Sequence, residues 1–188
     1  REYLPDSSSA SEAADDGVSV LDLGTGSGCL LVSTLVHASH VRGIGVDISA
    51  DALRVADINI RSHGLSDRAS LCHDDFNNDD LLLSSLGDNL TFDVILCNPP
   101  YLTKGECEKD GLAGPRLALV ADNRGLACYE AVARQVGAFL KANGVVILEV
   151  GGKRNVDDVR SIFGELEYVE TRPDDQGQGR CLVLRKKS

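Results

Sequence analysis

The hydrophobic and polar positions of the chain follow two alternating patterns. Segments whose apolar residues recur every three or four positions predict helices at 29–38, 49–63, 125–142 and 156–163. Short apolar runs bounded by turn-forming residues predict strands at 18–23, 41–46, 68–72, 91–97, 145–150, 166–171 and 180–185. Strands that alternate with helices in this way are typical of an α/β fold.

The order of these segments predicts a doubly wound sheet. Strands joined through helices run parallel, and right-handed crossovers bring their carboxyl ends to one edge. Only residues 173–179 separate the last two strands, too few for a crossover helix, so we expect these strands to be antiparallel. The expected fold is therefore a Rossmann-like, seven-stranded, mostly parallel sheet with one antiparallel strand.

Capping residues predict where two of the helices begin and end. Ser49 is a good N-cap for the second helix, and Gly64 closes it. The pair Asn143-Gly144 is expected to end the helix at 125–142.

The remaining segments are predicted to be loops. Residues 1–17 are polar and low in complexity and are expected to be flexible, which leaves 18–188 as one domain. The polar stretch before the fourth strand allows a short helix at 81–86. The charged, glycine-rich segment 103–114 is a candidate loop facing a substrate.

Three glycines follow the first predicted strand. Gly24, Gly26 and Gly28 have G-x-G-x-G spacing, where glycine permits a tight turn and the next helix offers free N–H groups. The dinucleotide fingerprint, G-x-G-x-x-G, has its third glycine one residue later. Because the loop contains no Lys and follows Asp22, it suits an adenosyl group without phosphates. The alternative is a glycine turn with a purely structural role.

Acidic residues end the next two predicted strands. Asp47 is placed to accept hydrogen bonds from the hydroxyl groups of a ribose. Asp74 is placed to accept from the exocyclic amine of adenine, with Phe76 packing near the base. Structural explanations stay open, since Asp47 can cap the following helix, and the nearby Asp75, Asp79 and Asp80 are most simply a solvated charge cluster.

A stiff polar segment follows the fourth predicted strand. Pro99 and Pro100 lack backbone N–H groups and fix φ, so the chain leaves the sheet in an extended conformation. Asn98 and Tyr101 are thereby held at the edge where open α/β sheets bind ligands. In the alternative interpretation, Asn98 only caps a turn.

Composition argues against several classes of partner. The net charge of −10 disfavours nucleic acid as the main partner, because phosphate binding normally requires a basic surface. No apolar run approaches the roughly 18 residues that cross a bilayer. Residues 1–17 contain no secretory signal, so we expect an intracellular protein that binds no membrane.

Cysteine and histidine positions predict no metal site. The six Cys residues form no C-x-x-C pair, and four of them lie inside apolar patterns, so we expect reduced core thiols. The four His residues lack ligand spacing, and no metal is expected. Ser and Cys residues lack an identifiable base partner, which argues against nucleophilic catalysis.

Several segments of the chain carry a family resemblance. They are 21–29 (Leu-Asp-Leu-Gly-Thr-Gly-Ser-Gly-Cys), 98–102 (Asn-Pro-Pro-Tyr-Leu), 115–119 (Pro-Arg-Leu-Ala-Leu) and 148–151 (Leu-Glu-Val-Gly), with Gly125-Leu126 and Tyr129. Together they resemble the HemK/PrmC release-factor glutamine methyltransferases, class I enzymes that use S-adenosylmethionine. The resemblance covers roughly residues 18–185. It implies the class I methyltransferase fold, with 18–188 as the catalytic domain and without the family's helical N-terminal domain.

The resemblance also implies roles for individual residues. The glycine loop would line the methionine part of S-adenosylmethionine, with the ribose at Asp47 and the adenine at Asp74. The implied catalytic residues are Asn98, Pro99 and Tyr101. The implied cofactor-binding residues are Asp22, Gly24, Thr25, Gly26, Gly28, Asp47, Ile48, Asp74, Asp75, Phe76 and Asn98.

The implied reaction is methylation of the glutamine side-chain amide in the Gly-Gly-Gln segment of a class I peptide release factor. An amide nitrogen is a poor nucleophile because its lone pair is delocalised. Orientation by the Asn98 side-chain oxygen and the Pro99 carbonyl is therefore expected to matter more than a base. Two alternatives stay open: an amino-methyltransferase acting on adenine or cytosine in DNA or RNA, and a catalytically silent cofactor-binding scaffold. The cytoplasm or the mitochondrial matrix is the expected location.

Overall fold

The computed structural model describes residues 17–76, 86, 90–100, 125–151 and 156–187. Its helices are α1 (Cys29–His37), α2 (Ala50–Ser62), α5 (Ala127–Phe139) and α6 (Val156–Ile162). Its strands are β1 (Val18–Leu23), β2 (Val41–Asp47), β3 (Ala69–His73), β4 (Phe92–Cys97), β5 (Leu140–Glu149), β6 (Glu167–Pro173) and β7 (Gly179–Arg185). The seven strands lie within about two residues of their predicted ranges, except for the start of β5.

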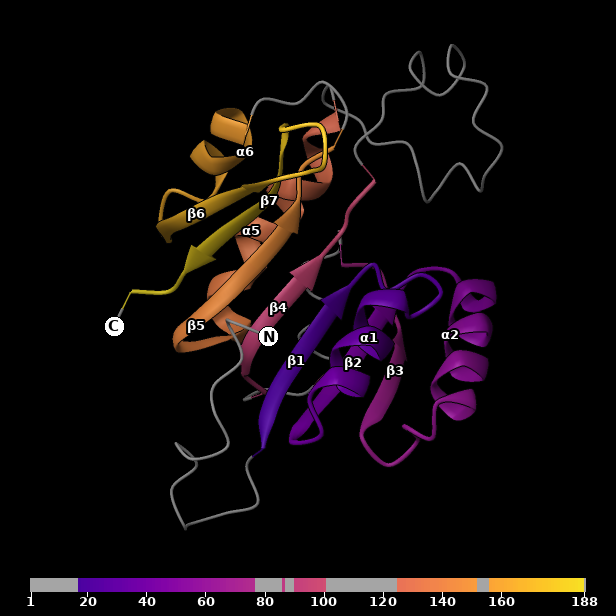
Figure 1. Cartoon of the computed structure of the whole chain (residues 1–188). Coiled ribbons are helices and arrows are strands. Elements are labelled where there is room, and N and C mark those ends of the chain that lie inside the picture. Colours follow the sequence, from indigo (N-terminus) through magenta and orange to yellow (C-terminus); the bar gives the residue numbers. More distant parts are fainter. Residues whose placement is uncertain (1–16, 77–85, 87–89, 101–124, 152–155, 188) are drawn as a thin grey trace.

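The strands form one sheet in the order β3-β2-β1-β4-β5-β7-β6. β3, β2, β1, β4 and β5 are parallel to one another, and β7 is antiparallel to both β5 and β6. The short hairpin between β6 and β7 makes β7 the one reversed strand (Figure 1). The predicted mostly parallel sheet with one antiparallel strand is confirmed.

Helices pack on both faces of this sheet and give the molecule two apolar cores. α1 and α2 pack with β1–β3, where Val20, Leu31 and Ile60 belong to one cluster of buried side chains. α5 and α6 pack on the other face, where Leu21, Val132 and other residues form the second cluster. Because β1 contributes to both clusters, it is the most buried strand, as expected for parallel strands covered on both faces.

Capping contacts explain where α1 ends and where α2 begins and ends. Ser49 begins α2 by accepting a hydrogen bond from the Ala52 backbone N–H at 3.2 Å, and Gly64 follows the helix with φ 66, both as predicted. Arg68 covers the carboxyl end of α1, where its guanidinium donates to the carbonyls of Leu35, Ala38 and Val41 at 3.0–3.1 Å. A cation is favourable at a helix carboxyl end.

α5 ends three residues before the predicted boundary at 142. Its last residue is Phe139, and Leu140 already pairs with β4. Both side chains are buried, so the turn from helix to strand occurs inside the core. Lys186 donates from Nζ to the carbonyls of Gly137 and Leu140, each at 2.7 Å, and satisfies acceptors that the helix end leaves open.

The Asn-Gly pair that was predicted to end this helix lies instead inside β5. Phe92 pairs with Leu140, whereas Val94 pairs with Val145, so the intervening residues of β5 form an irregular, bulged segment. Asn143 adopts φ 63 there. This left-handed residue lies where the register of the β4–β5 pairing shifts. The prediction that Asn143-Gly144 ends the helix was therefore wrong.

The five described cysteines are free thiols. Cys97 and Cys128 are buried and Cys72 and Cys181 half-buried, but Cys29 is exposed at the start of α1, so the expectation of a core thiol is wrong there.

None of the described helices is long and apolar enough to cross a membrane. The predicted flexible N-terminus, the short helix at 81–86 and the loop at 103–114 lie outside the described residues, apart from Gly17 and Leu86.

Candidate active site

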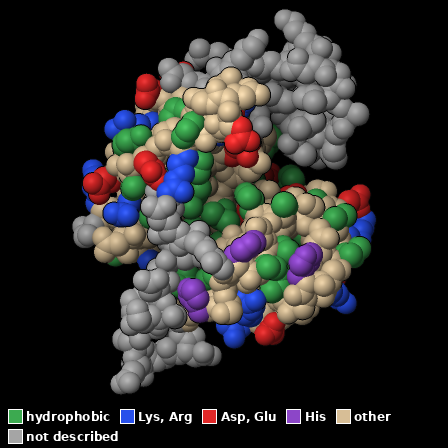
Figure 2. Space-filling model, in the orientation of Figure 1, with side chains coloured by type: hydrophobic (Ala, Val, Ile, Leu, Met, Phe, Trp, Pro, Cys, Tyr) green, Lys and Arg blue, Asp and Glu red, His purple; other side chains and the backbone are tan. Residues whose placement is uncertain are grey.

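The carboxyl ends of β1, β2, β3 and β4 lie at one edge of the sheet. Leu23 of β1 pairs with Val46 of β2 and with Cys97 of β4, and Asp47 pairs with His73. The segments that follow these strands therefore begin side by side. In the view of Figure 2, hydrophobic side chains are visible in the hollow between the α1–α2 half and the β5–β7 half of the molecule.

The glycine loop after β1 is held by backbone hydrogen bonds to β2. The N–H groups of Gly24 and Thr25 both donate to the Val46 carbonyl at 2.9 Å. Gly24, Gly26 and Gly28 have φ values of 71°, 57° and 77°. These values lie in the left-handed region, which favours glycine. The sequence pattern therefore reflects a sharp turn that leads directly into α1.

Asp22 lies beneath this loop and is almost fully buried, with 1% of its surface exposed. Its Oδ2 accepts a hydrogen bond from the Thr25 hydroxyl at 2.6 Å, whereas Oδ1 accepts none from the described residues. Burial raises the pKa of Asp22 to about 6, although the Thr25 hydroxyl and the Leu31 backbone N–H lower it, and the nearby Asp47 carboxylate raises it further. A half-satisfied buried carboxylate of this kind favours a hydrogen-bond donor or a cation beside it.

Asp47 connects the glycine loop to the start of α2. Its Oδ2 accepts from the Gly26 N–H and its Oδ1 from the Ser49 N–H, both at 2.8 Å. The structural role that the sequence left open for Asp47 is therefore present. Each carboxylate oxygen has a second lone pair, so these bonds do not prevent it from accepting from a ligand. Ile48, the next residue, is 44% exposed, an unusual position for an aliphatic side chain beside polar groups.

The segment after β3 carries a second half-satisfied carboxylate. Asp74 is 8% exposed; its Oδ1 accepts from the Asp75 N–H at 2.7 Å, and Oδ2 has no partner among the described residues. Its own N–H donates to the Asp47 carbonyl at 3.1 Å, which joins the ends of β2 and β3. Phe76 is buried, and its ring lies 3.5 Å from the position that a Cβ on Gly24 would occupy.

Asn98 follows β4 and is exposed, whereas Pro99 behind it is buried. The Asn98 carbonyl lies 4.0 Å from the position of a Cβ on Gly24, so the polar segment and the glycine loop are neighbours, as their shared sheet edge predicts. A buried proline fixes the exit of the strand and leaves the Asn98 side chain toward solvent. Tyr101 lies outside the described residues.

Three residues that the sequence did not single out support this edge. Gly45 in β2 lies beneath the loop, where a Cβ would come within 2.9 Å of the Thr25 side chain. Asn59 of α2 donates to the Ser27 carbonyl at 2.9 Å, and Gln135 of α5 donates to the Phe76 carbonyl. A glycine inside a strand, and a lone polar residue on the apolar stripe of a helix, were the signals that could have found Gly45 and Gln135.

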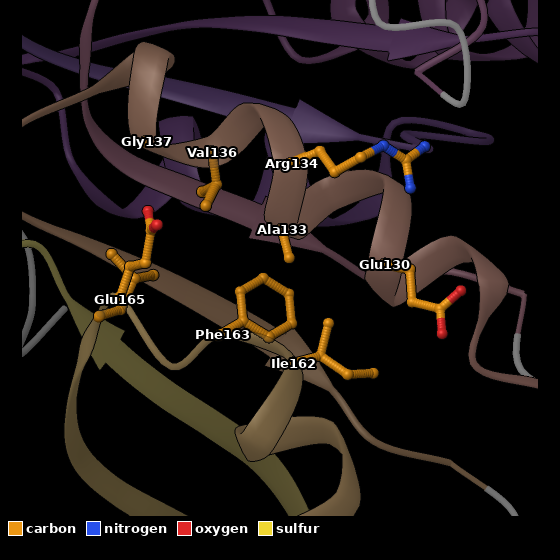
Figure 3. A pocket seen from close by; sticks show the side chains of 9 residues that line it. Glu130, Ala133, Arg134, Val136, Gly137, Ile162, Phe163 and Glu165 are labelled. Carbon is orange, nitrogen blue, oxygen red and sulfur yellow. The ribbon is translucent and has the colours of Figure 1, made fainter.

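Two hollows of the described surface lie apart from the glycine loop and Asn98. One, of about 470 Å³, lies between α5 and α6. Figure 3 shows that the apolar side chains of Phe163, Ile162 and Ala133 line it, together with the charged Glu130 and Arg134. The other, of about 520 Å³, lies beside α2 and includes His73. None of the residues that the sequence assigned to a cofactor lines either hollow.

Comparison with known proteins identifies the family and the fold of this chain. Residues 14–161 match the family model described as a methyltransferase domain. The chain belongs to the methyltransferase domain family. Among solved structures, a methyltransferase from Pyrococcus furiosus superimposes with a TM-score of 0.66 at 15% identity, covering 92% of this chain and 76% of that one. The expected class I methyltransferase fold is confirmed.

Curated relatives of this methyltransferase domain include glutamine methyltransferases. The chain is 36% identical to a bifunctional methyltransferase from Rickettsia felis over 93% of its length and 33% of the relative's. It is 36% identical to a ribosomal protein uL3 glutamine methyltransferase from Neisseria gonorrhoeae, covering 79% of this chain and 48% of that protein. It is 32% identical to a release factor glutamine methyltransferase from Nitratidesulfovibrio vulgaris, covering 88% and 57%.

These relatives confirm the resemblance that the motifs indicated. This chain matches only part of each of these relatives, between about one third and somewhat more than half of its length.

Proposed function

We propose that this methyltransferase domain transfers a methyl group from S-adenosylmethionine to the side-chain amide nitrogen of a glutamine in a protein, namely the Gly-Gly-Gln segment of a class I peptide release factor. The observation that carries the proposal is the exposed Asn98 on a proline-fixed strand end beside the glycine loop. An amide side chain held rigidly at that point matches an amide acceptor.

The unpaired polar atoms of the site fit S-adenosylmethionine. Asp22 Oδ1 and Asp74 Oδ2 are buried oxygens without a partner in the described chain, one beneath the glycine loop and one after β3. The first suits the ammonium group of the methionine part, and the second suits the adenine amine. Ile48 and Phe76 supply apolar surface for the base, and the Asp47 carboxylate keeps acceptor capacity for the ribose.

When bound, S-adenosylmethionine supplies an electrophilic methyl group on a sulfonium centre. The chain's own contribution is to orient the acceptor. The Asn98 side-chain oxygen and the Pro99 carbonyl accept the two hydrogens of the glutamine amide, so the nitrogen lone pair faces the methyl donor. Such orientation can contribute several kcal/mol without a base. The family resemblance gives Tyr101, which lies outside the described residues, a role at the substrate amide. The proton leaves to solvent after transfer, when the nitrogen has become strongly acidic.

Residues 18–188 form the catalytic domain in this proposal. The protein-substrate class is supported by the relatives named as glutamine methyltransferases, and the net charge of −10 disfavours nucleic acid. A second acceptor also has support, because one of those relatives is named for the ribosomal protein uL3. The same geometry at Asn98 serves a glutamine in either protein.

A panel of acceptors tests the proposed function. The protein is incubated with methyl-labelled S-adenosylmethionine and, separately, with a class I release factor, its Gly-Gly-Gln→Gly-Gly-Ala variant, ribosomal protein uL3, tRNA and duplex DNA. We expect label on the release factor and none on the alanine variant. Label on uL3 alone would move the substrate to the second candidate, and label on nucleic acid would contradict protein-glutamine methylation. Cofactor binding without transfer to any acceptor would favour the silent scaffold.

A further inference from the structure

α5 directs one buried polar side chain toward the segment after β3. Gln135 is 5% exposed and is the one amide side chain among the buried residues described for α5. Its neighbours along the buried stripe, at Ala131, Val132 and Phe139, are apolar and belong to the core. A buried amide must form hydrogen bonds to offset its lost hydration, so its partners indicate what it does.

The partner of this amide is the carbonyl of Phe76, which accepts from Gln135 Nε2 across 59 positions of sequence. The same nitrogen lies 3.5 Å from the Ala131 carbonyl, one turn earlier in α5, which limits the rotation of the side chain. Gln135 therefore joins the helix that covers one face of the sheet to a backbone atom at the edge that carries the candidate active site.

The segment 74–76 is thereby held at both ends. At its start the Asp74 N–H donates to the Asp47 carbonyl at 3.1 Å, and at its end the Phe76 carbonyl accepts from Gln135. Between these two anchors lie Asp74 Oδ2, which has no partner in the described part of the chain, and the Phe76 ring beside Gly24. A shift at the second anchor would move both the carboxylate and the ring.

We propose that Gln135 is a positioning residue that sets adenine selectivity, by fixing Asp74 and Phe76 from α5, whose buried residues share a core cluster with Phe76. The proposal rests on the proposed use of S-adenosylmethionine. Asp74 Oδ2 can accept from the amine of adenine, whereas the oxo group of hypoxanthine is itself an acceptor and meets the carboxylate unfavourably. Discrimination between the two bases therefore depends on where the carboxylate is held.

Ligand discrimination tests this role. Dissociation constants of S-adenosylhomocysteine and S-inosylhomocysteine are measured by calorimetry for the wild type, Gln135→Met and Gln135→Asn. Met keeps the volume without the donor, and Asn keeps the amide but shortens its reach by one methylene. We expect the wild type to prefer the adenosyl ligand by about tenfold or more, and both variants to lose most of that preference.

The control is Val136→Ala, the adjacent buried residue of α5, which lines the hollow between α5 and α6; it lowers stability but leaves the Gln135 hydrogen bond to Phe76 in place. Its preference for the adenosyl ligand should equal that of the wild type. Variants that fold and keep the preference would overturn the proposal, as would failure of both Gln135 variants to fold, because Gln135 would then serve only the core. If the wild type binds neither ligand, the proposed function itself fails.

Discussion

At the scale of single residues, the proposed function divides the site into side chains that would bind a ligand and one that would orient the acceptor. Among the described residues, Asp22 and Asp74 each have one buried carboxylate oxygen without a partner. Each oxygen of Asp47 accepts from one backbone N–H and keeps a second lone pair for a ligand. Asn98 is exposed and stands next to the loop that these carboxylates support. Substitutions should therefore separate binding from transfer.

Asn98→Ala tests the orienting role. Without the amide oxygen the acceptor nitrogen is no longer aligned, so kcat should fall by about 10²–10³-fold. The dissociation constant for S-adenosylhomocysteine should change by less than about threefold, because the glycine loop and its carboxylates are untouched. Asn59→Ala is the matched contrast: it removes the bond to the Ser27 carbonyl of the loop and should weaken binding while sparing the methyl-transfer step. An equal loss of binding and transfer in Asn98→Ala would make Asn98 a structural cap.

The pKa of Asp22 predicts how binding depends on pH. Since burial raises that pKa to about 6, the folded protein takes up a proton on acidification that removes the charge facing the ammonium group. The affinity for S-adenosylhomocysteine should fall about tenfold between pH 7.5 and pH 5.0. In Asp22→Asn it should be weak at both values and nearly flat, and a wild-type profile that stays flat would contradict the assignment.

The same shift fixes the sign for the unliganded protein. Between about pH 4 and pH 6 the folded chain binds more protons at Asp22 than the unfolded chain does, because the folded pKa is the higher one. This carboxyl group therefore lowers the stability of the free protein as pH rises through that window. A bound cation at Asp22 would offset the cost.

At the scale of elements, the sheet edge is maintained by contacts that reach it from its surroundings. β2 supplies a glycine beneath the loop, α2 and α5 each donate a side-chain amide to a loop carbonyl, and Arg68 secures the end of α1. Each contact joins a helix, strand or loop to a segment that is distant from it in the sequence. Their loss should have different consequences for ligand binding and for folding.

Gly45→Ala tests the close packing of β2 against the loop. The added Cβ would come within 2.9 Å of both Thr25 side-chain atoms, Oγ1 and Cγ2, and must displace the hydroxyl that donates to Asp22. Overpacking of this kind costs about 1–3 kcal/mol, so binding of S-adenosylhomocysteine should weaken about tenfold or more. Gly137→Ala is the control, since a Cβ there meets nothing within 4 Å and helix propensity should even raise the melting temperature. Equal effects at the two positions would contradict the packing argument.

Arg68→Met tests the cap on α1. Three carbonyl groups lose a charged donor, so the free energy of unfolding in urea should fall by about 1–3 kcal/mol. Arg42→Met removes an exposed arginine with one bond to the Asp67 carbonyl and should cost about 0.5 kcal/mol or less. Similar losses for both variants would show that the cap contributes nothing beyond a surface contact.

At the scale of the whole molecule, the topology was predictable because each level of the sequence agreed. Buried strands such as 18–23 are bounded by turn residues, and the short hairpin at 173–179 left β7 no parallel alternative. The end of α5 was not predictable, because Asn143-Gly144 suits a helix cap and a strand bulge equally well, and only tertiary pairing with β4 decides between them.

The candidate site was predictable in part for the same reason. Parallel strands must bring their carboxyl ends together, so Gly24, Asp47, Asp74 and Asn98 were placed at one edge from their positions alone. Which carboxylate oxygens remain unpaired, and the support from Gln135, depend on contacts between segments far apart in the chain. Sequence spacing carries no such information.

The most direct test of the central claim is to find the atom that receives the methyl group. The protein is incubated with a class I release factor and S-adenosylmethionine carrying a trideuterated methyl group, and the peptides are fragmented in a mass spectrometer. We predict a single added trideuteromethyl group on the side-chain nitrogen of the glutamine in Gly-Gly-Gln, and labelling at about one hundredth of the wild-type rate or less when Asn98 is replaced by Ala. A methyl group on another residue, or equal labelling by the Asn98→Ala variant, would contradict the account.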